Sequence, residues 1–156
     1  MALVRILVDG FSLLHAWPEV APRQPRHSAA ARDELVHWLT QYQDAIGTPM
    51  TVVFDGTNAP AGTPKIPSRP EMEILYSPAG RTADDLIERA THRLLDFGDV
   101  LVVTDDNAER STVLSLGGMT SGCSVFIDDL KSMLGEMKLD LEHLNRRERH
   151  QFKRPC

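Results

Sequence analysis

The sequence predicts an α/β fold, namely a three-layer α/β/α sandwich with a mainly parallel sheet of about five strands. Two short runs rich in Val, Ile and Leu, at 3–8 and 100–104, are each followed by aspartate. Such runs are typical of strands that are buried on both faces. Between the apolar runs lie segments whose apolar residues recur at helical spacing, and this alternation favours a parallel sheet covered by helices.

The first half of the chain alternates between strand and helix patterns. The elements expected are, in order, a strand at 3–8, a helix near 28–46, a strand at 51–54, a loop at 56–70 and a strand at 71–76. Ser28 is a favoured residue for the start of the helix. The loop is predicted from four prolines and two glycines within 56–70.

The second half continues the same alternation. The elements expected are a helix from Thr82 to about 97, a strand at 100–104, a helix near 107–116, a strand at 124–127 and a final helix near 129–150. Gly98 and the pair at 117–118 follow the first two of these helices, where glycine commonly ends a helix.

Length and composition predict a single domain over residues 1–156. No apolar run approaches the roughly 20 residues that span a bilayer, so we expect no membrane partner and a cytoplasmic location. The net charge of −5 is uneven, because residues 131–156 sum to +3 and the remainder to −8. A basic C-terminal helix or tail at about 129–156 is compatible with a nucleic-acid partner, and equally with a solvated helix end.

Six aspartates fall at the predicted carboxyl ends of strands or in the first turns of the helices that follow. They are Asp9, Asp55, Asp84, Asp85, Asp105 and Asp106. In a parallel sheet these positions share one edge, where like charges would repel each other unless a cation were bound. Hard cations such as Mg²⁺ or Mn²⁺ prefer oxygen ligands, and they support hydrolysis of phosphodiesters without a covalent protein nucleophile.

Each acid also has a purely structural interpretation. Thr82 to Asp85 resembles a capping box, Asp106 with Glu109 resembles a second helix start, and Asp-Gly pairs are common in turns. A receiver-domain phosphoacceptor is an alternative on this fold, although Asp9 lacks the second acid that usually accompanies it. The six histidines show no metal-ligand spacing, and we assign none of them to a metal.

Four segments together resemble the YacP-like group of NYN-domain proteins, within the PIN-like nuclease superfamily. They are Ile6 to Ser12 followed by Ala16 to Glu19, Val52 to Asp55, Gly80 to Glu88, and Val103 to Glu109. They span nearly the whole chain in the family's order. The resemblance implies a PIN-like fold and a metal-dependent endoribonuclease that hydrolyses RNA with Mg²⁺ or Mn²⁺. It also implies mRNA as the substrate class and the ribosome as a partner.

The resemblance places Asp9, Asp84 and Asp106 on the family's acidic positions, as catalytic and metal-binding residues. Asp55, Asp85 and Asp105 are expected to support the metal or hold a second ion. Ser12 stands where the group usually has Asn, and Asp105 replaces a small polar residue.

Residues expected to contact substrate are Ser12, Lys65, Arg69, Arg81 and Arg110. The alternative function is a non-catalytic RNA- or ribosome-binding module that keeps the fold. Ser12 and the basic tail favour that alternative, whereas the retained acids oppose it. The oligomeric state, the number of metal ions and the RNA target stay open.

Overall fold

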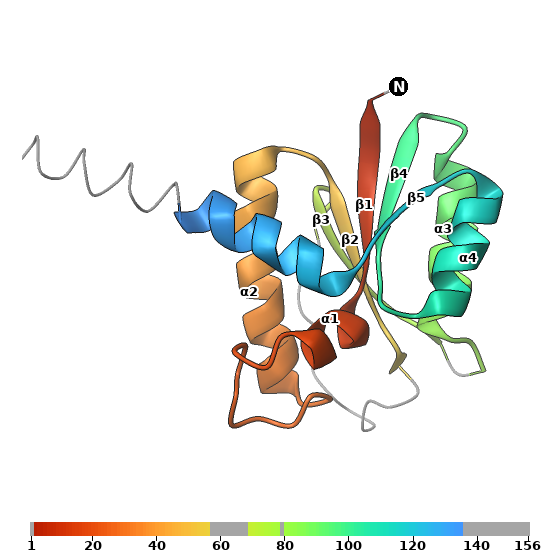
Figure 1. Cartoon of the computed structure of the whole chain (residues 1–156). Helices are drawn as coiled ribbons and strands as arrows, with labels where there is room; N and C mark the ends of the chain where they lie inside the picture. Colours follow the sequence, from red (N-terminus) through yellow and green to blue (C-terminus); the bar gives the residue numbers. More distant parts are fainter. Residues whose placement is uncertain (1, 57–68, 79, 136–156) are drawn as a thin grey trace, which may run out of the picture.

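A parallel five-stranded sheet forms the centre of the protein, as Figure 1 shows for the computed structural model, which describes residues 2–56, 69–78 and 80–135. The strands are β1 (Leu3–Asp9), β2 (Met50–Phe54), β3 (Met72–Tyr76), β4 (Asp99–Val103) and β5 (Met119–Ser121). Their order across the sheet is β3-β2-β1-β4-β5, and every neighbouring pair is parallel. The predicted α/β class and parallel sheet are therefore confirmed.

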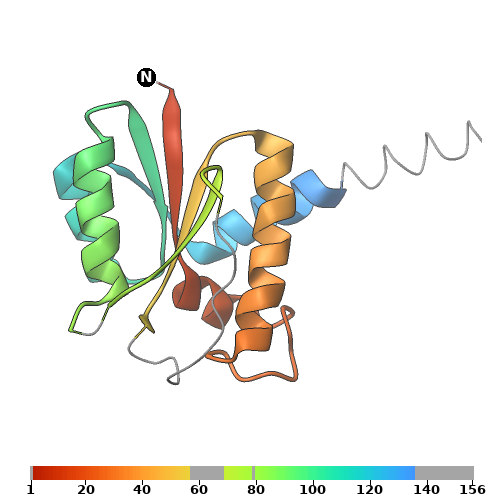
Figure 2. The ribbon, with the colours of Figure 1, turned by 180° about the vertical axis from the view of Figure 1, so that it is seen from behind.

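Helices cover both faces of the sheet. One face carries α1 (Gly10–Ala16), α2 (Ala29–Ile46) and a helix described over 123–135, and the other carries α3 (Ala83–Leu94) and α4 (Asn107–Leu116) (Figures 1 and 2). Successive residues of β1 pack against the helix layers on opposite faces of the sheet. Ile6 and Val8 pack with the α2 side, whereas Leu7 packs with Ile87 and Val113 of the α3–α4 side.

The order of the strands fixes where a site can form. The chain runs outward from β1 to β2 and β3, then returns to place β4 on the other side of β1. Strand order therefore reverses between β1 and β4. In open α/β sheets, the crevice outside the carboxyl ends of the strands at such a reversal is the usual place for a ligand.

Local sequence explains most helix boundaries. The Ser28 hydroxyl accepts a hydrogen bond from Ala31 N–H at the start of α2, as its residue type predicts. At the start of α3, Thr82 and Asp85 form the complete capping box, with bonds in both directions. The helix ends at Leu94, before the predicted end at 97.

The predicted strand at 124–127 is wrong, because the chain is helical from residue 123 onward. Cys123, Phe126, Ile127 and Leu130 are buried at helical spacing, so the short apolar run belongs to one face of a helix. The last strand is instead β5, a short polar edge strand. The final helix accordingly begins at 123 and not near 129.

The sequence shows no signal for α1, which lies between the expected strand at 3–8 and the expected helix near 28–46. Asp9 ends the strand and caps this helix, since its carboxylate accepts a hydrogen bond from Ser12 N–H at 3.3 Å.

Some predictions fall outside the described residues. These are most of the loop at 56–70, including Lys65, and the basic tail beyond 135. The assignment of residues 1–156 to a single domain stays a prediction. Within the described ranges, no helix combines the length and apolar character needed to cross a bilayer.

Candidate metal centre

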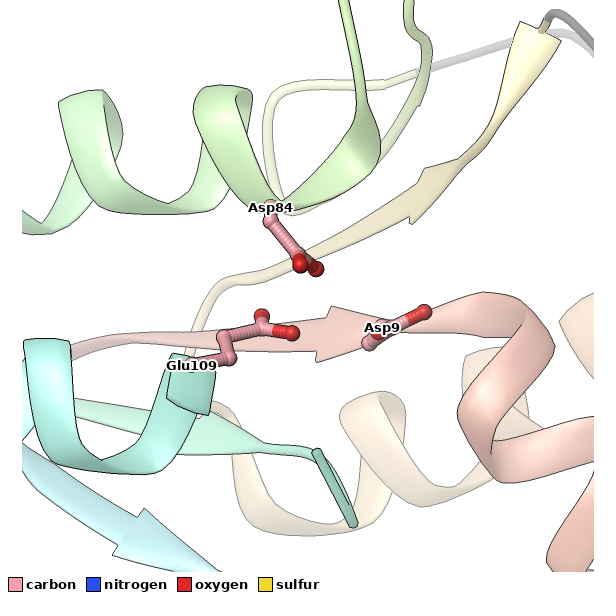
Figure 3. Close-up of side chains that lie close together, drawn as sticks. All are labelled: Asp9, Asp84 and Glu109. Carbon is pink, nitrogen blue, oxygen red and sulfur yellow. The ribbon is translucent and has the colours of Figure 1, made fainter. Parts of the chain in front are cut away.

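Three carboxylates from distant parts of the chain meet at the edge where strand order reverses. Asp9 ends β1, Asp84 lies in the first turn of α3, and Glu109 lies in the first turn of α4. One carboxylate oxygen from each lies within 4.8 Å of the other two, and Figure 3 shows their arrangement. Such a set of oxygen donors matches the preference of Mg²⁺ and Mn²⁺.

Glu109 is a buried member of this group, with only 6% of its surface exposed. Its Oε2 accepts a hydrogen bond from the Thr104 hydroxyl at 3.2 Å. Its Oε1 has no hydrogen-bond partner although it is buried. A buried carboxylate oxygen without a partner is costly, and Glu109 lies beside Asp9 and Asp84, so its environment fits a metal ligand.

The electrostatics of the group reflect the same crowding. Burial and the nearby carboxylates of Asp84 and Asp9 raise the pKa of Glu109 from an ordinary 4.5 to about 10. Burial also raises the pKa of Asp9, with Asp84 and Asp106 adding to the rise. Without a cation, Glu109 is therefore protonated at neutral pH. A divalent ion would displace that proton and offset most of the charge of the three carboxylates.

Asp106 reaches the same place with a different local role. It lines a cavity of about 360 Å³ together with Asp9, Asp55 and Asp84. Its Oδ1 accepts hydrogen bonds from the N–H groups of Ala108 and Glu109, so it caps α4. The structure thus brings the three predicted catalytic residues Asp9, Asp84 and Asp106 to one cavity. Glu109 is the third member of the close carboxylate group, and the sequence did not predict it as a site residue.

The other predicted acids divide into two kinds. Asp55 lies on the wall of the same cavity and accepts a hydrogen bond from the Ser77 hydroxyl. Asp85 belongs to the capping box of α3. Asp105 accepts a hydrogen bond from Cys123 N–H at 2.8 Å, at the start of the helix over 123–135. The last two side chains have local structural roles and do not line the cavity.

Ser12 links the two central strand ends. Its hydroxyl accepts a hydrogen bond from Asp105 N–H at 2.9 Å, and its own N–H donates to Asp9. Ser12 also lines the cavity, as expected of a residue near substrate. In this chain it therefore ties the end of β1 to the segment after β4.

The predicted phosphate-binding cations are scattered. Arg81 lies just before α3 and lines a neighbouring cavity with Arg89 and His92. Arg110 lies in the first turns of α4. Arg69 exchanges backbone hydrogen bonds with Met72, the first residue of β3. It therefore lies at the amino ends of the strands, whereas the acids lie at their carboxyl ends.

Two residues of this region escaped the sequence reasoning. The sequence pattern presents Glu109 only as part of a helix start and of a family segment, although it lies in the first turn of α4 as Asp84 lies in the first turn of α3. His27 lines the cavity with the acids. It lies in a loop without metal-ligand spacing, so the sequence offered no signal for it.

Comparisons with known proteins find a family that matches the sequence and solved structures that match the fold. The sequence model for the YacP-like NYN domain matches residues 6–155. The uncharacterised protein YacP of Bacillus subtilis (strain 168) is 25% identical over 129 residues, which cover 82% of this chain and 75% of that protein.

Two crystal structures of Rae1 (YacP) from Bacillus subtilis share the fold. One superposes with a TM-score of 0.81 at 22% identity and covers 97% of this chain and 86% of that one. The structure of its W164L mutant gives a TM-score of 0.78 at 21% identity and covers 92% and 85%. At this identity the likeness concerns the fold.

Proposed function

Because the chain belongs to the YacP-like NYN-domain family, we propose that it is a Mg²⁺- or Mn²⁺-dependent endoribonuclease. NYN domains are generally nucleases, with RNA as the implied substrate. The proposal extends to mRNA as the substrate class, the ribosome as a partner and the cytoplasm as the location. These three extensions rest on the family resemblance.

The observation that carries the proposal is the group of three carboxylate oxygens within 4.8 Å of one another. The unpartnered Oε1 of buried Glu109 supports it, because packing alone gives no reason to bury that atom beside two more acids. Asp9, Asp84 and Glu109 would hold the cation. Asp55 and Asp106, which line the same cavity as Asp9 and Asp84, would assist it.

The residues of the site would have different roles in hydrolysis. A bound divalent cation supplies charge neutralisation at the phosphate and lowers the pKa of a water molecule. Asp9, Asp84 and Glu109 fix its position at the strand ends, while Thr104 orients Glu109. Cys123 does not offer a competing nucleophile, because burial raises the pKa of its thiol to about 12.

The electrostatics also explain why catalysis would depend on metal. Without a cation, several carboxylates face the cavity that a phosphodiester must enter, and they repel it. A bound cation would offset part of this negative charge and offer the phosphate a positive centre to approach.

A nuclease assay on single-stranded RNA with and without Mn²⁺ tests the proposal. The wild-type protein should cleave internally only with Mn²⁺, and Asp84→Asn and Glu109→Gln should abolish cleavage. Asp96→Asn is a matched control, because it removes one exposed carboxylate beyond the end of α3, away from the cavity. Adding ribosomes to the assay tests the extension to the ribosome as a partner.

A melting experiment separates this proposal from the alternative function. Mn²⁺ should raise the melting temperature of the wild type by mass action. An RNA-binding module without catalysis would bind RNA, yet show neither this shift nor cleavage.

A further inference from the structure

The cavity that contains the acids has an aromatic wall. Phe11 and His27 line it together with Asp9 and Asp84. The two rings lie 4.6 Å apart between centroids and are tilted by 60°. Phe11 is buried at 8% exposure, whereas His27 is exposed. His27 is therefore the ring that a ligand in the cavity meets, and Phe11 forms its support.

Contacts on several sides hold the His27 ring and backbone. Phe11 in turn packs edge-on against Phe54 at 5.5 Å, which connects the wall to the end of β2. The ring of His15 lies 5.7 Å from that of His27. The carbonyl of His27 accepts a hydrogen bond from the guanidinium of Arg32, whose side chain is buried.

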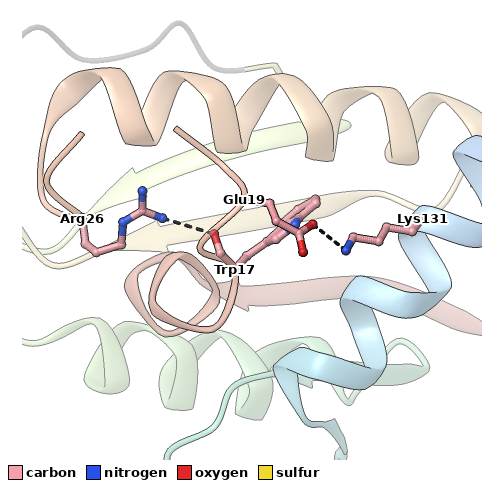
Figure 4. Close-up of polar contacts among 4 residues, drawn as sticks. All are labelled: Trp17, Glu19, Arg26 and Lys131. Carbon is pink, nitrogen blue, oxygen red and sulfur yellow. Dashed lines mark hydrogen bonds and ion pairs between the residues drawn. The ribbon is translucent and has the colours of Figure 1, made fainter. Parts of the chain in front are cut away.

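The loop that carries His27 is fixed by its neighbour Arg26. The Arg26 guanidinium donates to five backbone carbonyls, those of Leu14, Trp17, Val20, Ala21 and Gln24. The ion pair of Glu19 with Lys131 ties the same loop to the helix over 123–135, as Figure 4 shows beside the Arg26–Trp17 bond. A loop held in this way presents the ring without further ordering on binding.

We propose that His27, supported by Phe11, is a stacking platform for one unpaired nucleobase of the RNA beside the carboxylate group. His27 is an exposed ring held against a buried aromatic, and bases of single strands stack on such aromatic side chains. Because a paired base keeps its neighbours on both faces, this platform selects single-stranded RNA. It tolerates any base, since every base offers a π face.

The inference rests on the proposed function for its substrate class, and it assigns His27 a role that no metal chemistry requires. Among the described residues, the group that could hold a cation comprises Asp9, Asp84 and Glu109, without His27. His27 is thus a positioning residue that sets which nucleotide lies next to the acids.

The test measures binding of a short single-stranded oligoribonucleotide in the Asp84→Asn background, where RNA is not consumed, at a Mn²⁺ concentration that saturates the melting shift of that variant. His27→Ala should weaken the affinity roughly 5- to 100-fold, the range for loss of one base–aromatic stack. His27→Phe and His27→Trp should restore it. His37→Ala is the matched control, because His37 is exposed on α2 and its ring contacts Gln41 and Trp38.

A scan of abasic nucleotides identifies the stacked base. At one position of the RNA, an abasic site should lower the affinity of the protein that keeps His27. The same abasic site should not lower the affinity of the His27→Ala variant any further. The inference is overturned if His27→Ala binds as tightly as its parent, if the aromatic variants fail to rescue, or if no position shows this coupling. Cleavage is measured separately in the chain with intact Asp84. A protein that binds RNA through His27 but does not cleave it would contradict the proposed nuclease activity and leave the stacking platform standing.

Discussion

The Thr104 hydroxyl donates a hydrogen bond to Glu109 Oε2 over 3.2 Å, and both residues are buried. The same oxygen of Thr104 accepts a hydrogen bond from Asp106 N–H at 3.1 Å. One side chain after β4 therefore orients a proposed ligand and supports the start of α4.

Replacing Thr104 by Val should destabilise the fold by about 1–3 kcal/mol, because it leaves a buried carboxylate oxygen and an N–H group without partners. Thr104→Ser keeps the hydroxyl and loses only a methyl group, so it should cost less. Urea unfolding of both variants measures the difference. Equal losses in the two would show that packing of the methyl group, and not the hydroxyl, is what matters.

Glu109 should make the stability of the metal-free protein depend on pH. Between pH 4.5 and about 10 the unfolded chain releases a proton that folded Glu109 keeps, so raising the pH favours the unfolded state. We expect the unfolding free energy to fall across this window, and Glu109→Gln to remove that part of the slope. Melting in buffers from pH 5 to 9, with a chelator present, measures it. An unchanged slope in the variant contradicts the assignment.

Removing one charge while keeping the helix cap should not harm the fold. Asp9→Asn and Asp106→Asn retain an N-cap oxygen and relieve repulsion, so the metal-free melting temperature should be unchanged or higher. Mn²⁺ should then stabilise these variants less than the wild type. Asp106→Ala separates the two roles, because it loses the cap and should cost about 1 kcal/mol.

Asp105 should matter for folding and not for metal. Its carboxylate accepts from Cys123 N–H, so Asp105→Ala should destabilise the protein by about 1 kcal/mol through the start of the last described helix. The shift in melting temperature caused by Mn²⁺ should persist in this variant. If Asp105→Ala abolishes the shift, Asp105 is a metal ligand, as the sequence suggested.

Periodicity and capping residues were sufficient to predict β1 to β4 and α2 to α4. The short run at 124–127 misled because four apolar or small residues fit a strand and a helix face equally well. Only the buried spacing of Cys123, Phe126 and Leu130 in three dimensions decides between them.

The candidate site was partly predictable for a related reason. Parallel strands place Asp9 and Asp106 at one edge, and the first turn of α3 adds Asp84. The selection of Glu109 depends on how α4 rotates against Thr104, which residue type alone does not encode. His27 comes from a loop whose path depends on the Arg26 hydrogen bonds.

The central position of β1 has a consequence for when the protein becomes active. Its partner β4 begins at Asp99, so the innermost strand pair joins segments that are synthesised far apart in time. Such non-local pairing is slow to form. A growing chain that ends before α4 holds Asp9 and Asp84 but lacks Glu109. Under the proposed function, the nuclease therefore remains inactive during its own synthesis until nearly all of the described fold has left the ribosome.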